Sequence, residues 1–70
     1  MDILLEKGMR KVDGNRFRGI TEPLRVTVLE PYLMFAEDAF AGCGEVTIRA
    51  HSGSFAEFYA KKHGLRFERL

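Results

Sequence analysis

The sequence predicts a small α/β domain, with α+β as the alternative, from three patterns. Two segments, 24–29 and 45–51, are rich in β-branched residues and alternate in polarity like strands. A segment with clear helix start and stop signals separates the second strand from a closing strand at 65–70. A strong turn signal precedes all of these. We therefore expect an N-terminal β-hairpin followed by β-α-β-α-β, with a single small sheet and two helices.

The turn signal Asp13-Gly14-Asn15 separates two extended segments within residues 9–20, which predicts the N-terminal hairpin. Glycine and asparagine tolerate the positive φ that the tight turns of hairpins require. No internal repeat and no second domain are apparent along the chain. With 70 residues, the protein is expected to form a single small domain over residues 1–70.

Two helices are expected between the later strands. The first, Tyr32–Ala41, follows Pro31, which suits a first helical position, and Gly42 stops it. The second begins at Ser54, whose hydroxyl can accept the amide of Glu57, while the Glu57 carboxylate reaches back. The apolar faces of all these elements predict a core that consists of Val26, Val28, Phe35, Phe40, Val46, Ile48, Phe55, Phe58 and Phe67.

Composition narrows the classes of function. Charged residues make up 30% of the chain with a net charge of +1, which is typical neither of a disordered chain nor of a strongly basic nucleic-acid binder. Cys43, His51 and His63 are the only soft metal ligands, and none lies at a recognised ligand spacing, so no metal site is expected. The single cysteine and the lack of a membrane-spanning run or a signal-peptide pattern predict a cytoplasmic protein without membrane contact.

The segment SFAEFYAKKHGLRFER resembles the last helix and closing strand of the GNAT N-acyltransferase superfamily. The expected order of elements from Leu24 to Leu70 is also similar to the C-terminal half of that fold. The resemblance implies acetyl-CoA as the cofactor and acyl transfer as the reaction, with Tyr59 as the residue that protonates the departing thiolate. A CoA-dependent N-acyltransferase, alone or completed by dimerisation, is therefore one candidate function.

The chain departs from that family at the loop that binds the pyrophosphate of acyl-CoA. The family's loop is rich in glycine and offers backbone amides at a helix start. The corresponding stretch here, LEPYLMFAED, has no glycine, carries the Glu30 carboxylate and loses one amide donor at Pro31. We therefore expect no bound cofactor, and the sequence favours a non-enzymatic domain, a degenerate relative of the acyltransferase fold.

Four basic residues gather around the expected hairpin, with Phe17 between them. A basic ribbon with an interleaved aromatic residue can contact phosphates, which makes a nucleic-acid-binding module a second alternative. A solvated hairpin whose charges discourage edge pairing explains the same residues without a ligand, and we favour that interpretation. The candidate phosphate contacts are Arg10, Lys11, Arg16 and Arg18.

The expected helix at 32–41 is apolar almost all round apart from Glu37 and Asp38. In so small a domain, one sheet face cannot cover that much apolar surface, so part of it should stay exposed. Tyr32, Phe35 and Phe40 are therefore a candidate interaction surface. The function that the sequence favours is protein association, either as a homodimer or with another protein partner.

Overall fold

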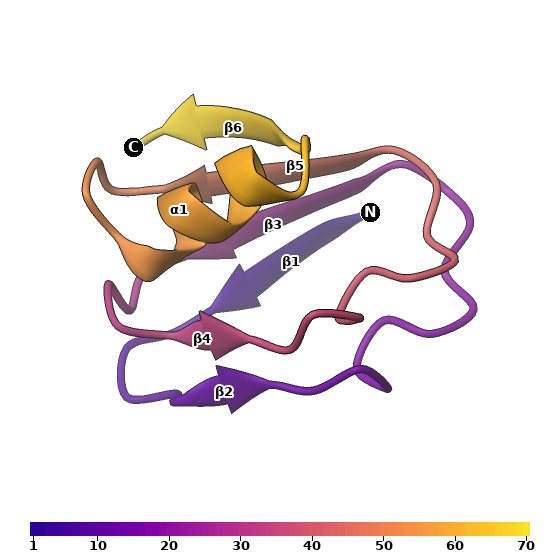
Figure 1. Cartoon of the computed structure of the whole chain (residues 1–70), viewed down its shortest axis with the longest axis horizontal. Coiled ribbons are helices and arrows are strands. Elements are labelled where there is room, and N and C mark those ends of the chain that lie inside the picture. The colour runs from indigo at the N-terminus through magenta and orange to yellow at the C-terminus, as the bar shows by residue number, and fades with distance from the viewer.

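Four parallel strands form the larger of two sheets in the computed structural model, which describes all 70 residues (Figure 1). In spatial order these strands are β1 (Asp2–Leu5), β3 (Leu24–Val28), β5 (Val46–Ala50) and β6 (Arg66–Arg69). A second layer packs against one face of this sheet and contains β2 (Lys11–Val12), β4 (Met34–Phe35) and helix α1 (Phe55–Lys62). The predicted α/β class is confirmed, although there are two sheets and one helix.

The chain follows the same path three times, in coils over residues 2–23, 24–45 and 46–70. Each coil passes through a first-layer strand, then a second-layer segment, and then returns, and the third coil returns into the first layer as β6. Equivalent positions lie 22 or 23 residues apart: Asp2 is opposite Arg25 and Leu24 is opposite Val46 in the first layer, and Lys11 is opposite Met34 in the second. The molecule is therefore a short solenoid, in which each coil stacks on the next. Sequence analysis missed this internal repeat.

The returning segments of the first two coils repeat their turns. The amides of Ile20 and Cys43 each donate to the carbonyl three residues earlier, at 3.2 and 3.1 Å. Gly19 and Gly42, which precede them, both have positive φ, of 86° and 78°. The two glycines let the chain turn in the same way at the same point of each coil, because only glycine adopts this conformation without strain.

The predicted hairpin over residues 9–20 is wrong. β2 pairs in parallel with β4, and the residues after it form turns rather than a strand. The side-chain carboxylate of Asp13 accepts a hydrogen bond from the backbone amide of Asn15 at 3.0 Å. Neither Gly14 nor Asn15 has positive φ. The turn signal is therefore real, but it makes a local bend within a coil. A Cβ at Gly14 would meet the Asp38 carboxylate of the next coil, and that exposed side chain would have to move aside.

The predicted helix Tyr32–Ala41 is also wrong. β4 occupies its start, where the amides of Met34 and Ala36 donate to carbonyls of the first coil at 3.0 and 2.9 Å. Tight turns follow, in which the amide of Ala39 donates to the carbonyl three residues earlier. Pairing with the preceding coil has overridden the local helix propensity of this segment.

Helix α1 confirms the second predicted helix. Ser54 is its N-cap and accepts the amide of Glu57 at 3.2 Å, while the Glu57 carboxylate accepts the amide of Gly53 at 2.7 Å. The amide of Phe55 donates to the carbonyl of Pro31 at 2.9 Å, as a strand of a third coil would. The helix therefore stands where a third second-layer strand would lie. It is too short and too polar to cross a lipid bilayer.

The core lies between the two layers, and most of its predicted members are confirmed. Val26 and Ile48 are opposite one another on β3 and β5, and both are fully buried. Of the other predicted members, Val28, Phe40 and Val46 are buried, and Phe35 and Phe67 are partly buried.

The prediction that Phe55 and Phe58 belong to the core is wrong, because 46% and 73% of their surfaces are exposed. Helix α1 turns Ala56, Tyr59 and Ala60 towards the sheet. Residues one position away on a helix point about 100° off, so the two phenylalanines face solvent.

An aromatic stack runs through the coils at their returning ends. Phe17 and Phe40 are equivalent residues of the first two coils, and their rings are parallel within 6° at a centroid distance of 5.0 Å. Tyr59 of α1 continues the stack at 6.0 Å from Phe40, and His63 follows at 4.2 Å from Tyr59. The stack joins all three coils, which makes it a large part of their mutual packing.

Candidate protein-interaction surface

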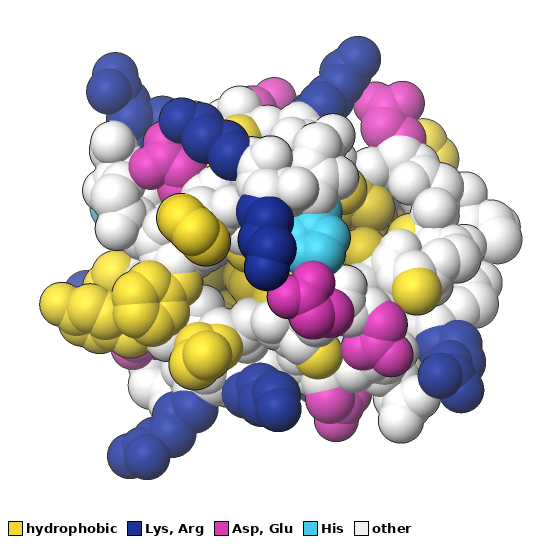
Figure 2. Space-filling model, viewed as in Figure 1, with side chains coloured by type: hydrophobic (Ala, Val, Ile, Leu, Met, Phe, Trp, Pro, Cys, Tyr) yellow, Lys and Arg dark blue, Asp and Glu magenta, His cyan; other side chains and the backbone are white.

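Four large apolar side chains stand exposed together on the outer side of the second layer. The exposed fractions of Tyr32, Met34, Phe55 and Phe58 are 70%, 58%, 46% and 73%. Figure 2 shows hydrophobic side chains gathered at the left of the view, over the start of α1 and the region of β4. We call these four residues the apolar surface. A contiguous patch of aromatic and methionine side chains is the composition that marks interfaces.

The turn before β4 fixes the position of Tyr32. The Glu30 carboxylate accepts the amides of Gly8 and Tyr32, at 2.9 and 3.2 Å, and so ties this turn to the first coil. These two hydrogen bonds lower the pKa of Glu30 below its usual range. The Tyr32 ring meets the Phe55 ring edge to face at 5.6 Å, so the turn and the helix start support one another.

Two hollows lie along the apolar surface and share Met34 in their linings, and we call them together the groove. One has a volume of about 470 Å³ and includes Met9, Arg10 and Tyr32. The other has a volume of about 220 Å³ and a mainly apolar lining of Met34, Phe35, Glu37, Phe55, Phe58, Tyr59 and Lys62.

Acidic groups beside the groove are already engaged. Glu37 accepts a hydrogen bond from Lys62 at 3.0 Å and lies 3.2 Å from His63, and Lys62 is the main cause of its lowered pKa. Glu57 bonds the Gly53 amide and lies 3.1 Å from Lys61, and these contacts lower its pKa in turn. Each carboxylate is therefore neutralised by partners within the molecule.

The predicted interaction residues divide between surface and core. Tyr32 lies on the apolar surface, and Phe35 is half-buried on the floor of the groove. The prediction that Phe40 is part of an interaction surface is wrong, since Phe40 is only 9% exposed and belongs to the aromatic stack. Sequence analysis missed Met34, and it placed Phe55 and Phe58 in the core. No signal in the sequence could have placed them, because α1 has apolar side chains on both faces and only the packing of Ala56, Tyr59 and Ala60 against the sheet fixes its phase.

Tyr59, the expected proton donor of an acyltransferase, is buried between the layers. Its hydroxyl donates to the carbonyl of Glu37 at 3.2 Å, and its ring lies 5.0 Å from that of Phe35. Burial raises its pKa, and the negative charges of Glu37 and Asp38 add to that effect. Between Leu24 and Leu70 only the second expected helix forms. The family relationship itself stays a prediction.

The four candidate phosphate contacts are all exposed but do not share a hairpin. Arg10 and Lys11 lie at β2, beside the groove, whereas Arg16 and Arg18 lie in the turns that follow. Phe17, the expected interleaved aromatic residue, is 2% exposed and stacks on Phe40. The structure therefore brings Arg10 and Tyr32 together in the lining of the groove, and Lys11 lies opposite Met34 on the neighbouring strand.

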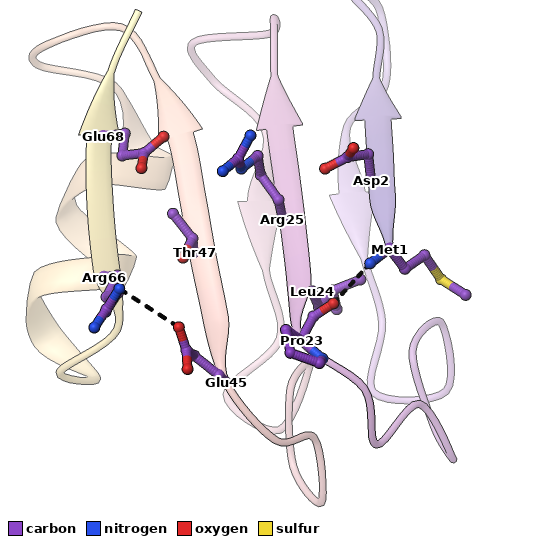
Figure 3. Close-up of a pocket in the computed structure, with 9 residues that line it drawn as sticks. All are labelled: Met1, Asp2, Pro23, Leu24, Arg25, Glu45, Thr47, Arg66 and Glu68. Carbon is purple, nitrogen blue, oxygen red and sulfur yellow. Dashed lines mark hydrogen bonds and ion pairs between the residues drawn. The ribbon is translucent and has the colours of Figure 1, made fainter.

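The outer face of the first layer holds another hollow, of about 300 Å³, with a polar lining (Figure 3). Some of its charged groups have partners: Arg66 lies 3.5 Å from Glu45, and the terminal ammonium of Met1 donates to the carbonyl of Pro23 at 2.7 Å. Asp2 and Arg25 take part in no salt bridge. Nowhere do three or more His, Cys, Asp or Glu side chains converge in a way that could hold a metal ion. This face is a solvated sheet surface.

The chain was compared with protein-family models, curated proteins and solved structures, and none of them matches it.

Proposed function

We propose that the protein is a non-enzymatic domain that acts by association with another protein chain, through the apolar surface of Tyr32, Met34, Phe55 and Phe58. The observation that supports the proposal is that these four large side chains are exposed side by side. Tyr32, Met34 and Phe58 each have more than half of their surface exposed. Aromatic and methionine side chains are enriched where two proteins meet, and a few residues at the centre of an interface supply most of its binding energy.

The surroundings of the surface also support association over chemistry. Glu37 and Glu57 are the carboxylates nearest the groove, and both have lowered pKa values because of their cationic or amide partners. Carboxylates held ionised in this way suit a fixed polar rim rather than proton transfer near neutral pH. The apolar centre and charged border then form the usual anatomy of an interface.

Site-specific photocrosslinking tests the proposal. A photoreactive phenylalanine analogue at position 58 should give a covalent adduct of higher mass in cells that produce the protein. The same analogue at position 25, on the outer face of β3, is the matched control and should give little adduct. Adduct formation at neither position, or equally at both, would count against association through this surface.

A further inference from the structure

We infer that two copies of the protein pair their β1 edges antiparallel across a twofold axis, which joins their larger sheets into one. This inference goes beyond the proposed function, because β1 belongs to the first layer, whereas the apolar surface lies on the second. It follows from three features of β1: an unprotected edge, outward backbone groups and a match to its own copy.

The two edges of the larger sheet differ in protection. β1 and β6 are its end strands, each with one neighbour (Figure 1). The residues of β6 are RFER, and charges of this kind discourage pairing with another chain. The residues of β1 are DILL, without lysine or proline, and Leu4 is 56% exposed. An apolar edge strand of this kind is open to pairing with a further strand.

Backbone groups of β1 also point away from the sheet. The carbonyl of Leu5 accepts the amide of Leu29 of the second coil at 2.9 Å, so the backbone groups of Leu5, and with them those of Ile3, face β3. Backbone groups alternate in direction along a strand, so those of Asp2 and Leu4 point outward. Figure 3 shows Asp2 on the outermost strand of the sheet. These groups can bond to another strand without breaking any bond within the molecule.

A second copy fits this edge without placing like charges opposite one another. When Ile3 lies opposite its own copy in an antiparallel pair, Asp2 of each protomer lies opposite Leu4 of the other. Both residues have outward backbone groups, so each such pair exchanges two hydrogen bonds. A register centred on Leu4 instead places Asp2 opposite Glu6, and that repulsion selects the register centred on Ile3.

The second copy also covers apolar side chains on both faces of the sheet. Ile3, which is partly buried against the core, meets its own copy directly. Leu4 on the outer face reaches its own copy diagonally, at a spacing that long side chains can bridge. A matching strand needs apolar residues at both positions, and β1 itself is such a strand. The twofold axis makes each of these contacts twice.

The second layer limits the affinity of this dimer. Its edge at the same end is β2, which has two residues, and Arg10 and Lys11 take part in no salt bridge. Two copies bring these cations closer together, and like charges oppose association. We therefore expect a dissociation constant in the micromolar range, which falls as salt screens the repulsion. β1 remains unpaired for part of the time.

Sedimentation equilibrium of two matched variants tests the inference. Leu4 and Leu70, which follows β6, are 56% and 42% exposed at opposite edges of the sheet, so both tolerate lysine. We expect wild type and Leu70→Lys to show the same rise in mass above 8.0 kDa with concentration. Leu4→Lys should weaken association about tenfold or more, because it places a cation at the paired edge. Circular dichroism checks that both variants fold.

Amide exchange followed by NMR locates the contact. The amide of Leu4 points outward in the monomer and gains an acceptor only in the dimer, whereas that of Ile3 faces β3 in both states. Protection of the Leu4 amide should therefore rise with protein concentration in the wild type, and the amide at position 4 of Leu4→Lys should stay unprotected.

Several outcomes would overturn the inference. These are a wild type that remains an 8.0 kDa monomer at millimolar concentration, a dimer that Leu4→Lys leaves intact, or a Leu4 amide whose exchange does not depend on concentration. A dimer that Phe58→Glu dissociates and Leu4→Lys does not would place the contact on the apolar surface instead. Photocrosslinking at position 58 tests the proposed function separately, and its result should be the same in Leu4→Lys.

Discussion

Four of the six phenylalanines take one of two separate structural roles, and the other two, Phe35 and Phe67, are partly buried. Phe17 and Phe40 stack face to face between the layers, with 2% and 9% of their surfaces exposed. Phe55 and Phe58 lie outside the second layer. Burial rather than residue type therefore decides which of them stabilise the fold and which are free to contact a partner.

Alanine substitution should separate these roles. Phe17→Ala removes a buried ring and leaves a cavity, so we expect it to lower the free energy of unfolding by about 3–5 kcal/mol. Phe58→Ala removes mainly exposed surface and should cost less than about 1 kcal/mol. Urea denaturation of both variants checks the prediction. If Phe58→Ala proved as destabilising as Phe17→Ala, the assignment of the α1 faces would be wrong.

Residue burial could be predicted from the sequence where the alternation is strict. Val26 and Ile48 sit in strands that alternate apolar and polar residues, so their inward direction followed from a period of two. Phe58 could not be placed in the same way. It lies in a helix of eight residues with apolar side chains on both faces, and only the packing of Ala56 and Ala60 against the sheet determines the phase.

At the scale of elements, local signals predicted α1 but failed for the segment after Pro31. Ser54 and Glu57 form hydrogen bonds within their own turn, so the sequence alone carries that information. The strand β4 instead depends on carbonyls of Arg10 and Val12, more than twenty residues away. Such distant pairing overrides propensity and has no local signature.

Glu37 links the second coil to the end of α1, and its contribution to stability should depend on pH. Lys62 and His63 lower its pKa in the folded protein below its ordinary value of 4.5, so the stabilisation is complete above that pH and is lost as the pH falls through the lower folded pKa. We expect Glu37→Gln to reduce the free energy of unfolding near pH 6 and to have little effect near pH 3. Urea denaturation at both pH values measures this.

Glu22→Gln is the matched control, because Glu22 is exposed and takes part in no salt bridge. A difference between wild type and Glu37→Gln that stays constant from pH 6 to pH 3 would contradict an electrostatic link at this position.

At the scale of the whole molecule, the repeat escaped sequence analysis because the coils share few residue types. Phe17 and Phe40 match, as do Gly19 and Gly42, but Arg16 corresponds to Ala39. What the coils share is a path, held by parallel pairing in register. Burial and backbone hydrogen bonds enforce that path with many different side chains, so the sequence shows it only faintly.

Hydrogen exchange should follow the stacking order. β3 and β5 each have a strand on both sides, whereas β1 and β6 each have one neighbour. We expect the amides of Val26 and Ile48 to exchange most slowly, at the rate of global unfolding, and those of β1 and β6 to exchange faster through local opening. Amide exchange followed by NMR measures this. Uniform protection across all four strands would show that the coils open only together.

Helix α1 has a consequence for aggregation. A stack of parallel strands can lengthen into a fibre when both of its layers offer free strand edges to the next molecule. At the α1 end the second layer offers a helix, whose backbone hydrogen bonds are internal, and the first layer offers the edge of β6, which carries the charged and exposed Arg66 and Glu68. A molecule arriving at this end finds a strand edge in one layer only, so the α1 end disfavours head-to-tail polymerisation.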